Sequence, residues 1–254
     1  MPVFDLYAAY YDLLYRDKDY SVEAKYVAAL IRAAHPAATS ILEMGCGTGA
    51  HALELVQLGF EVLGIDISLS MIEKASARRQ AQPERAPLVD FKVGDVRSYR
   101  VARKFDAVVS LFHVMSYQTG NDDLRDAVRT ARSHLESGGI FVFDFWYGPA
   151  VLTDRPKNAI KQVKDDHISV IRRTTPTLDV NRNRVDVRFD IEIRATDGEC
   201  RDVQEVHGMR YLFLPEIEEY LRAGGFALEA CTAWMSRSAP SDSSWYACAV
   251  ARAE

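Results

Sequence analysis

Residues 41–49 read Ile41-Leu42-Glu43-Met44-Gly45-Cys46-Gly47-Thr48-Gly49. The apolar run up to Met44 predicts a short buried strand, and helical spacing resumes over residues 50–56. Gly45, Gly47 and Gly49 alternate along the connection, where they permit positive φ angles and leave no Cβ to hold a ligand away. A strand, a tight turn and a helix in this order predict a ligand lying against the turn at the helix N-terminus. The alternative is a glycine-rich turn that only packs tightly.

The spacing of these glycines separates two nucleotide-binding families. NAD-dependent oxidoreductases carry G-x-G-x-x-G at such a turn, whereas here the third glycine comes one residue early and Glu43 stands two places before the first. The pattern E-x-G-x-G-x-G after a strand resembles motif I of the class I S-adenosylmethionine (SAM)-dependent methyltransferases. This resemblance implies an α/β fold with a doubly wound, mostly parallel, seven-stranded Rossmann-like sheet. It also implies SAM as the cofactor and S-adenosylhomocysteine as its product.

Composition limits the classes of partner. The chain has 254 residues, of which 48% are hydrophobic and 26% charged, as in ordinary globular proteins. With 31 basic and 36 acidic side chains the net charge is −5, so we expect no concentrated positive face and no nucleic-acid partner. No leader pattern and no apolar run of about 20 residues occurs, so we expect no membrane partner and a cytoplasmic protein, either a monomer or a homodimer. The four cysteines form no C-x-x-C pair and have no nearby histidines, and we expect no metal.

A second buried strand over residues 62–65 ends at Asp66. Asp66 follows Gly45 by 21 residues, close to the spacing of about 20 at which a strand-end carboxylate reaches a ribose hydroxyl in βαβ nucleotide sites. A carboxylate can accept hydrogen bonds from both ribose hydroxyls. The alternative role for Asp66 is to cap the helix that begins near Ser68.

The resemblance extends these two features to a full cofactor site. In the family a methionine packs on the adenine face and an aspartate caps the adenine amino group, and Met71 and Asp95 match these positions. On the residues alone, core filling by Met71 and an ordinary turn role for Asp95 stay open. The tyrosine-rich residues 7–20 are expected to fold over the site as a lid, with surface packing of the rings as the alternative. The expected cofactor-binding residues are Tyr11, Tyr20, Glu43, Gly45, Cys46, Gly47, Gly49, Asp66, Ile67, Met71, Asp95, Val96 and Leu111.

A fourth strand over residues 105–111 resembles motif IV of the family. Ligands of open α/β sheets bind beyond the carboxyl ends of the strands, so His113 and Tyr117 are the expected catalytic residues. Histidine titrates near the working pH, which makes His113 a candidate general base; a histidine that only hydrogen-bonds at the sheet edge is the alternative. Tyr117 matches the position at which amino-sugar methyltransferases place a polar ring beside the acceptor nitrogen. The next helix is expected to end at Gly138-Gly139, with a fifth strand over residues 140–145.

The pattern changes after the fifth strand. Apolar and polar residues alternate with period 2 over residues 185–193, and Asp197-Gly198 is a hairpin signal, so we expect an inserted antiparallel β-sheet. Sugar-amine N-methyltransferases carry a comparable insertion with an E-x-H pattern, which Glu205 and His207 match. Alternation places both on an apolar face, and without the resemblance a satisfied buried pair is favoured over a pocket wall. The expected substrate-binding residues are Tyr117, Trp146, Glu205 and His207.

These features together predict one catalytic domain with an insertion. We expect residues 1–150 and 214–254 to form a SAM-binding methyltransferase domain with an N-terminal lid helix, and residues 151–213 to form an inserted antiparallel β subdomain. The chain is identified as a SAM-dependent methyltransferase of a small polar acceptor, with the amino group of a sugar or sugar-nucleotide as the most specific form. An O-methyltransferase of a small metabolite and a non-catalytic SAM-binding protein stay open. An NAD-dependent oxidoreductase is disfavoured by the position of the third glycine.

Overall fold

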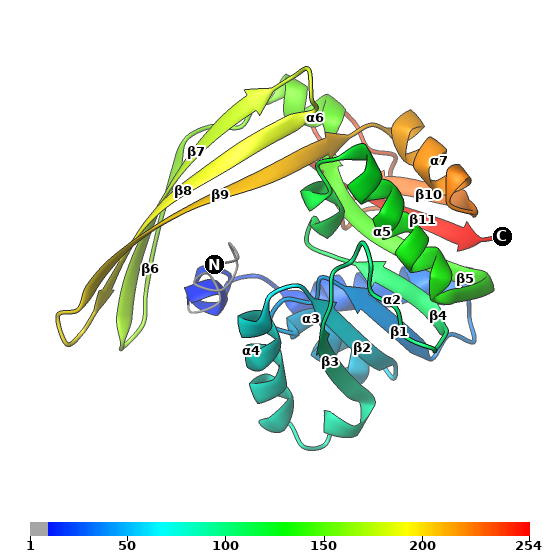
Figure 1. The fold of residues 1–254 in the computed structure, drawn as a ribbon, viewed down its shortest axis with the longest axis horizontal. Coiled ribbons are helices and arrows are strands. Elements are labelled where there is room, and N and C mark those ends of the chain that lie inside the picture. Colours follow the sequence, from blue (N-terminus) through cyan, green and yellow to red (C-terminus); the bar gives the residue numbers. More distant parts are fainter. Residues whose placement is uncertain (1–9) are drawn as a thin grey trace.

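The computed structural model describes residues 10–254. Tyr7, Ala8 and Ala9 of the predicted lid lie outside the described residues, and residues 10–14 are helical. Figure 1 shows two larger parts, a sheet covered by helices on both faces and a long antiparallel arm that extends from it. The N-terminal helical turn lies between them (Figure 1).

Within residues 10–254, seven strands form the central sheet in the order β3-β2-β1-β4-β5-β11-β10. The pairs among β1, β2, β3, β4 and β5 are parallel, while β11 runs antiparallel to both β5 and β10. The predicted class, a doubly wound and mostly parallel sheet, is confirmed. The strand bounds are β1 Ser40–Met44, β2 Glu61–Asp66, β3 Val89–Val93, β4 Phe105–Ser110, β5 Leu135–Tyr147, β10 Phe226–Ala233 and β11 Tyr246–Ala253.

Helices bury both faces of this sheet, which explains why its strands are apolar at successive positions rather than alternating. One buried cluster joins Ile41 and Val109 to α2, α3 and α4; the other joins Leu42 and Val108 to α5 and α7. The bounds are α2 Tyr20–Ala34, α3 Ala50–Gln57, α4 Leu69–Gln80, α5 Asn121–Ser133, α6 Gly148–Thr153 and α7 Leu214–Ala223, with short 3₁₀ turns η1 Ala86–Leu88 and η2 Val114–Tyr117.

The boundary between α5 and β5 differs from the expectation. The helix ends at Ser133 rather than at Gly138-Gly139, and β5 already begins at Leu135. Leu135 pairs with Phe105 and Ile140 with Ala107, so the residues between them form an irregularity in the strand. Gly138 takes a φ of 88° there, which glycine adopts without strain.

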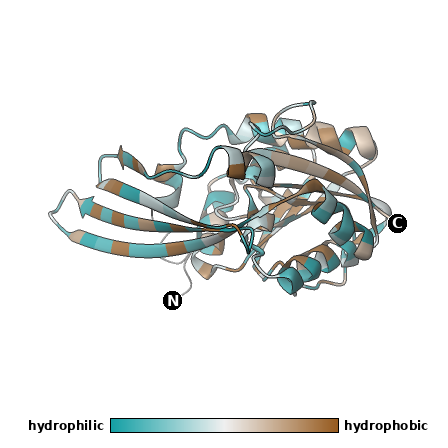
Figure 2. Ribbon diagram, turned by 90° about the horizontal axis from the view of Figure 1, so that it is seen from above, coloured by the Kyte–Doolittle hydropathy of each residue, from teal (hydrophilic) through white to brown (hydrophobic). Residues whose placement is uncertain are grey.

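The insertion is antiparallel, as expected. Its strands are β6 Ala159–Lys164, β7 Ile168–Asp179, β8 Arg184–Ala195 and β9 Cys200–Leu212, and they pair in chain order. The end of β9 pairs with the end of β5, at Trp146 with Tyr211, which attaches the arm to the central sheet. Hydrophobic and hydrophilic residues alternate along the arm (Figure 2). Its outward face carries ion pairs such as Arg188 with Asp190 at 2.9 Å.

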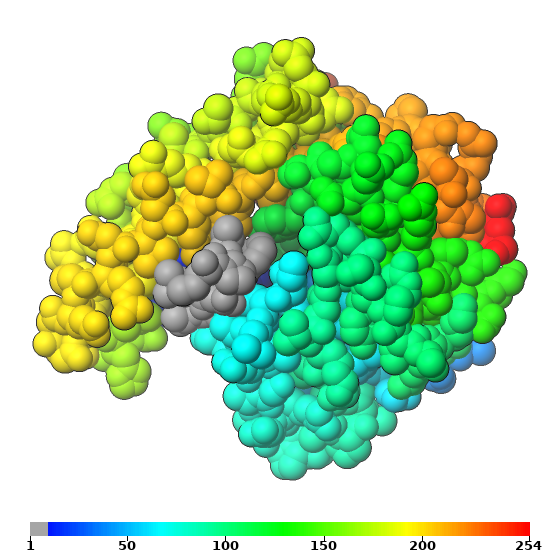
Figure 3. Space-filling view, in the orientation of Figure 1, coloured from blue at the N-terminus to red at the C-terminus, as the bar shows by residue number. Residues whose placement is uncertain are grey.

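The inward face of the arm packs against the N-terminal segment. Tyr10 and Leu14 of that segment are fully buried in one cluster with Val170 and Ile191 of the arm and Met71 of α4. In the space-filling view the far end of the arm, in yellow, stands apart from the cyan and teal helical face of the central sheet (Figure 3). The expected division at residues 150/151 and 213/214 stays a prediction, with the arm strands running from Ala159 to Leu212.

Candidate active site

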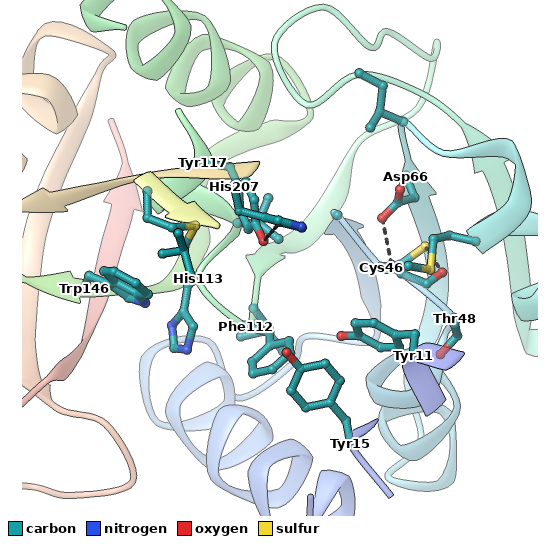
Figure 4. Close-up of a pocket in the computed structure, with 18 of the residues that line it drawn as sticks. Tyr11, Tyr15, Cys46, Thr48, Asp66, Phe112, His113, Tyr117, Trp146 and His207 are labelled. Carbon is teal, nitrogen blue, oxygen red and sulfur yellow. Dashed lines mark hydrogen bonds between the residues drawn. The ribbon is translucent and has the colours of Figure 1, made fainter. Parts of the chain in front are cut away.

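A cavity of about 650 Å³ lies beyond the carboxyl ends of β1, β2, β4 and β5. This size suits a small-molecule site, for which roughly 300–1,000 Å³ is usual. Figure 4 shows Asp66 and Cys46 at one end, Tyr117 and His207 at another, and Tyr11 and Tyr15 entering from the N-terminal segment. The predicted residues that line it are Tyr11, Tyr20, Gly45, Cys46, Gly47, Asp66, Ile67, Met71, Asp95, Val96, Leu111, His113, Tyr117, Trp146 and His207.

Three predicted residues, Glu43, Gly49 and Glu205, do not line this cavity. Glu43 and Glu205 are buried behind it, at 1% and 6% exposure. Gly49 packs closely against Phe91, because a Cβ at Gly49 would lie 2.6 Å from Cζ of Phe91.

The glycine turn is open to the cavity at one position. A Cβ built on Gly47 meets nothing within 4 Å, whereas one on Gly45 would lie 2.5 Å from a methyl group of Val114. Gly45 and Gly47 both have positive φ, 79° and 53°. Gly47 therefore leaves space that a bound ligand can occupy, while Gly45 is required by packing within the protein.

Asp66 is the last residue of β2 and is hydrogen-bonded to the glycine turn. Its Oδ2 accepts a hydrogen bond from the backbone N–H of Gly47 at 2.9 Å, and its Oδ1 accepts one from the N–H of Ser68 at 2.9 Å. Burial raises the pKa of Asp66, and the backbone donors oppose that shift. Ser68 itself caps α4, since its hydroxyl accepts from the N–H of Met71. The carboxylate thus faces the cavity and holds the glycine turn at the same time.

Glu43 lies behind the turn in an apolar setting. Burial, with the nearby charge of Asp66, raises the pKa of Glu43 to about 8. Within the described residues its Oε2 has no hydrogen-bond partner, and its Oε1 lies 4.0 Å from Nδ1 of His51. An open glycine at the front of the turn and an orphaned carboxyl oxygen behind it fit a polar cofactor at this end of the cavity.

The N-terminal segment is held to the glycine turn and to α4 by polar contacts. Asp12 accepts a hydrogen bond from the hydroxyl of Thr48 in the glycine turn at 2.8 Å, and pairs with Arg78 of α4 at 2.9 Å. Tyr20 packs edge-on against His51 with ring centroids 4.8 Å apart. The tyrosine-rich sequence of residues 7–20 predicts a lid. The contacts of Asp12 and Tyr20 show how the described part of that segment is held at the turn.

Asp95 lines the cavity but is already paired. Arg97 makes a forked contact with it, Nε to Oδ1 at 3.0 Å and Nη2 to Oδ2 at 2.6 Å. This guanidinium lowers the pKa of Asp95 and also contacts Asp123 at 2.8 Å. Arg97 lines the cavity too, and we did not predict it. Its position two residues after Asp95, within the same turn, was the available signal.

Beside the cavity, β4 leads into two consecutive residues with left-handed backbone. Phe112 has φ 63° and His113 has φ 67°, a conformation that costs energy for residues other than glycine and that clusters at functional sites. Asp144 of β5 stabilises it by accepting the N–H of His113 at 3.0 Å. Oδ2 of Asp144 lies 2.6 Å from Nδ1 of His113, a close contact that lacks the alignment of a hydrogen bond. The ring of Tyr246 stacks on His113 at 4.4 Å.

Tyr117 ends η2 and faces the arm. Its hydroxyl lies 2.9 Å from Nδ1 of His207, and Nε2 of His207 lies 3.2 Å from Oε2 of Glu205. The hydroxyl of Tyr10 donates to Oε1 of Glu205 at 3.0 Å. Alternation correctly places Glu205 and His207 on the inward face. The sequence left open a satisfied buried pair or a pocket wall, and each describes one residue. Glu205 is a buried, hydrogen-bonded group, whereas His207 lines the cavity.

The arm adds a cation that we did not predict. Arg172 lines the cavity, donates from Nη1 to the hydroxyl of Tyr15 at 3.2 Å and lies over the ring of Phe189 at 4.5 Å. The alternating pattern around Val170 and Thr174 in β7 was the available signal, since residues two apart share a face. Further lining residues, outside the individually named site residues, include Tyr15, Thr48, His51, Phe112, Gln118, Lys157, Met209 and Tyr246.

Two features of residues 10–254 bear on other functions. In that range no three His, Cys, Asp or Glu side chains gather where they could hold a metal ion. No helix there is long and apolar enough to cross a membrane. The absence of a metal stays a prediction.

Comparison with known proteins gives consistent matches. Residues 41–139 match the family described as "Methyltransferase domain". A similar curated relative is dTDP-3-amino-3,4,6-trideoxy-alpha-D-glucopyranose N,N-dimethyltransferase of Streptomyces venezuelae, with 32% identity over 226 residues that cover 88% of this chain and 91% of that protein.

Solved structures agree over nearly the whole chain. Streptomyces venezuelae DesVI superposes with a TM-score of 0.81 at 27% identity, covering 98% of both chains. SAM-bound CalS10, an amino pentose methyltransferase from Micromonospora echinaspora involved in calicheamicin biosynthesis, superposes with a TM-score of 0.75 at 25% identity, covering 99% of this chain and 98% of that one. The match includes the arm as well as the central sheet.

Proposed function

The chain belongs to the class I SAM-dependent methyltransferases, and from that premise we propose that it methylates the amino group of a sugar or sugar-nucleotide. The observation that carries the proposal is a single cavity with two different ends. The glycine turn and Asp66 form one end; Tyr117, His113 and the inward face of the arm form the other. Two of the relatives named above are named for amino sugars, which supports the choice of acceptor.

The cofactor is SAM, which supplies an electrophilic methyl group on a sulfonium centre. We assign Asp66 to the ribose hydroxyls and the open surface at Gly47 to close contact with the cofactor. Met71, Val96 and Leu111 supply apolar wall, with Asp95 held by Arg97 at the same end. Cys46 and Ile67 complete the turn and the strand end. Tyr11 and Tyr20 cover this end from the N-terminal segment.

The main task of the protein is alignment. A neutral amine is a good nucleophile, so a site that holds its lone pair in line and excludes water supplies most of the acceleration. Arg172 in the wall disfavours a second positive charge and therefore favours the neutral form of a bound amine. We assign Tyr117 and Trp146 to contact with the acceptor, and His113 to the position beside the reacting nitrogen.

A specific observation also supports a second candidate, O-methylation of a small metabolite. A hydroxyl acceptor needs a general base, and the contact between His113 and Asp144 is an arrangement that would orient one. The amine proposal is preferred because two relatives that cover most of this chain are named for amino sugars.

The experiment is methyl transfer from labelled SAM to a panel of amino sugars, nucleotide-linked amino sugars and matched hydroxyl sugars. Calorimetric titration with SAM, S-adenosylhomocysteine and NAD accompanies it. The proposal is supported if the protein binds SAM and S-adenosylhomocysteine but not NAD, and if the label appears in an amino sugar. Binding of SAM without transfer to any acceptor supports a non-catalytic binding protein instead.

We further propose that the protein is cytoplasmic and is a monomer or a homodimer, with no nucleic-acid and no membrane partner. We also propose that residues 1–150 and 214–254 form one domain and that residues 151–213 form the inserted subdomain.

A further inference from the structure

Four side chains form a hydrogen-bonded row from the acceptor end of the cavity to the N-terminal segment. The row runs from Tyr117 to His207, then to Glu205 and finally to Tyr10, with separations of 2.9, 3.2 and 3.0 Å. Tyr117 and His207 line the cavity, whereas Glu205 is buried behind it and Tyr10 is fully buried. The row therefore leads from the acceptor into the protein interior.

The donors and acceptors in this row have one consistent direction. Tyr10 donates to Glu205, as expected if Glu205 is an ionised carboxylate that only accepts. Nε2 of His207 must then carry the proton that it shares with Glu205. Nδ1 of the neutral imidazole is left as an acceptor, so the hydroxyl of Tyr117 donates to it. Tyr117 lines the cavity, and a hydroxyl oxygen that donates its own proton to His207 can accept another from a bound group.

Tyr117 alone is a poor proton acceptor. Burial, followed by the charges around it, raises the pKa of the Tyr117 phenol far above its usual value, so the phenolate is not available near neutral pH. A proton can pass onto the Tyr117 oxygen only if its own proton leaves at the same time. Nδ1 of His207, 2.9 Å away, is the group placed to take it.

We propose that Tyr117, His207 and Glu205 form a relay that removes the proton from the methylated amine, so that one bound amine can be methylated twice. The inference rests on the proposed function, since it needs an amine acceptor. Glu205 and Tyr10 are positioning residues: Glu205 sets the tautomer of His207, and Tyr10 holds Glu205 and closes the row against solvent. An amine that has gained one methyl is an ammonium ion, and it needs this step before a second transfer.

The step balances in protons and charge. The N–H bond of the methylammonium breaks and an O–H bond forms on Tyr117, while the original O–H bond of Tyr117 breaks and an N–H bond forms at Nδ1 of His207. The amine becomes neutral and the imidazole becomes an imidazolium that faces the carboxylate of Glu205. The proton passes to water when the spent cofactor is exchanged.

Groups from several elements surround the relay. The charged or titratable groups that face it are Tyr10, Tyr11 and Tyr15 of the N-terminal segment, Asp66 of β2, Tyr117 of η2, Arg172 of β7 and Glu205 of β9. Phe189 packs against the His207 ring at 4.9 Å and limits water there.

The test compares Glu205→Gln and His207→Gln with Glu192→Gln, a matched change on the outward face of the same sheet. The substrate is an amino sugar that the wild-type protein methylates in the panel. Single-turnover rates are measured for the free amine and for its monomethyl form between about pH 7 and about pH 9.5, with mass spectrometry of the products. NMR of the ligand-free wild-type protein reports the tautomer of His207.

We expect Glu205→Gln and His207→Gln to slow transfer by about 10-fold to 100-fold at the low end of this range and to release monomethyl product. At the high end, where the amine loses its proton in solution, both variants should approach the wild-type rate. Glu192→Gln should match the wild type throughout. The His207 spectrum should show a proton on Nε2 and none on Nδ1.

Two results would overturn the relay. One is a loss of rate that is the same at every pH, as a structural role predicts, and the other is a proton on Nδ1 of His207. Because Glu205→Gln preserves shape, it keeps the test decisive if His207→Gln fails to fold, and Tyr10→Phe provides a second conservative variant. A wild-type protein that methylates no amine would instead contradict the proposed function.

Discussion

The carboxylate of Asp66 is hydrogen-bonded to the backbone N–H of Gly47 at 2.9 Å, so the end of β2 and the glycine turn form one unit. The two features that the sequence marks separately are thus in direct contact. Loss of this carboxylate removes the proposed ribose contact and also the hydrogen bond that holds the turn.

We expect Asp66→Ala to weaken SAM binding by about 1–3 kcal/mol, the range for losing a charged hydrogen-bond partner, while the protein stays folded. Calorimetric titration measures the affinity and circular dichroism the fold. Asp90→Ala on β3, outside the cavity and paired with Arg79 and Lys92, is the control and should bind SAM normally. Equal affinity in Asp66→Ala and the wild type would remove the ribose assignment.

The glycine turn allows a comparison of two neighbouring substitutions. Gly47→Ala adds a Cβ that meets no protein atom within 4 Å, so the cost to folding should be only the roughly 1–2 kcal/mol of a left-handed residue. SAM affinity should nevertheless fall by tenfold or more, about 1.4 kcal/mol, because the Cβ enters the cavity. Gly45→Ala should lower the melting temperature further, since its Cβ meets Val114. Unchanged SAM titration in Gly47→Ala would show that this surface does not face the cofactor.

Glu43 should make the stability of the ligand-free protein depend on pH. Its pKa is about 8 in the folded protein and near the ordinary value of 4.5 in the unfolded chain, so the folded state binds the extra proton between these values. The protonated Glu43 therefore stabilises the folded protein fully below the unfolded pKa of 4.5. This contribution is lost as the pH rises toward the folded pKa of about 8. The loss is on the order of a few kcal/mol, at about 1.4 kcal/mol per pKa unit.

Glu43→Gln provides the check, because an amide cannot ionise. Denaturant unfolding between about pH 5 and about pH 8 should show a flatter dependence in the variant than in the wild type. Stability of the wild type that increases over this range, or an identical slope in both proteins, would contradict the assignment of a protonated buried Glu43.

His113 and Asp144 should act as a unit if their contact matters for the reaction. For an amine acceptor we expect His113→Ala and Tyr117→Phe each to slow transfer by about 10-fold to 100-fold, because alignment supplies most of the acceleration. In His113→Ala the rate should still rise with pH through ionisation of the substrate amine. Asp144→Asn combined with His113→Ala should cost no more than His113→Ala alone.

A hydroxyl acceptor predicts a different outcome for the same variants. Loss of the base would then cost the upper part of the 10²–10⁴ range for general catalysis, and the pH dependence would disappear with His113. Wild-type rates in His113→Ala, Tyr117→Phe and the double variant would place the acceptor elsewhere in the cavity.

The sequence predicts the features of this fold that depend on local pattern. The glycine turn, the strand-end Asp66 and the alternating strands of the arm are each encoded within a few residues. The error at the α5 to β5 boundary has a physical cause as well. Gly138 and Gly139 are typical of a helix end, and here they lie in a strand irregularity that only the pairing with β4 specifies.

The parts of the site that the sequence did not predict depend on contacts between distant elements. Tyr10 and Glu205 are 195 residues apart and meet because the arm folds over the N-terminal segment. His113 and Asp144 meet because β4 and β5 are neighbours in the sheet, a contact that position alone does not reveal. Arg172 lies on a face that alternation identifies, but its entry into the cavity depends on how the arm curves.

The most direct test of the central claim uses one amino sugar and its matched hydroxyl sugar as competing acceptors for labelled SAM. The site of labelling is read by mass spectrometry and NMR. The account predicts label on nitrogen of the amino sugar and none on the hydroxyl sugar. Label on oxygen, or SAM binding without transfer to either sugar or to any member of the wider panel, would contradict it.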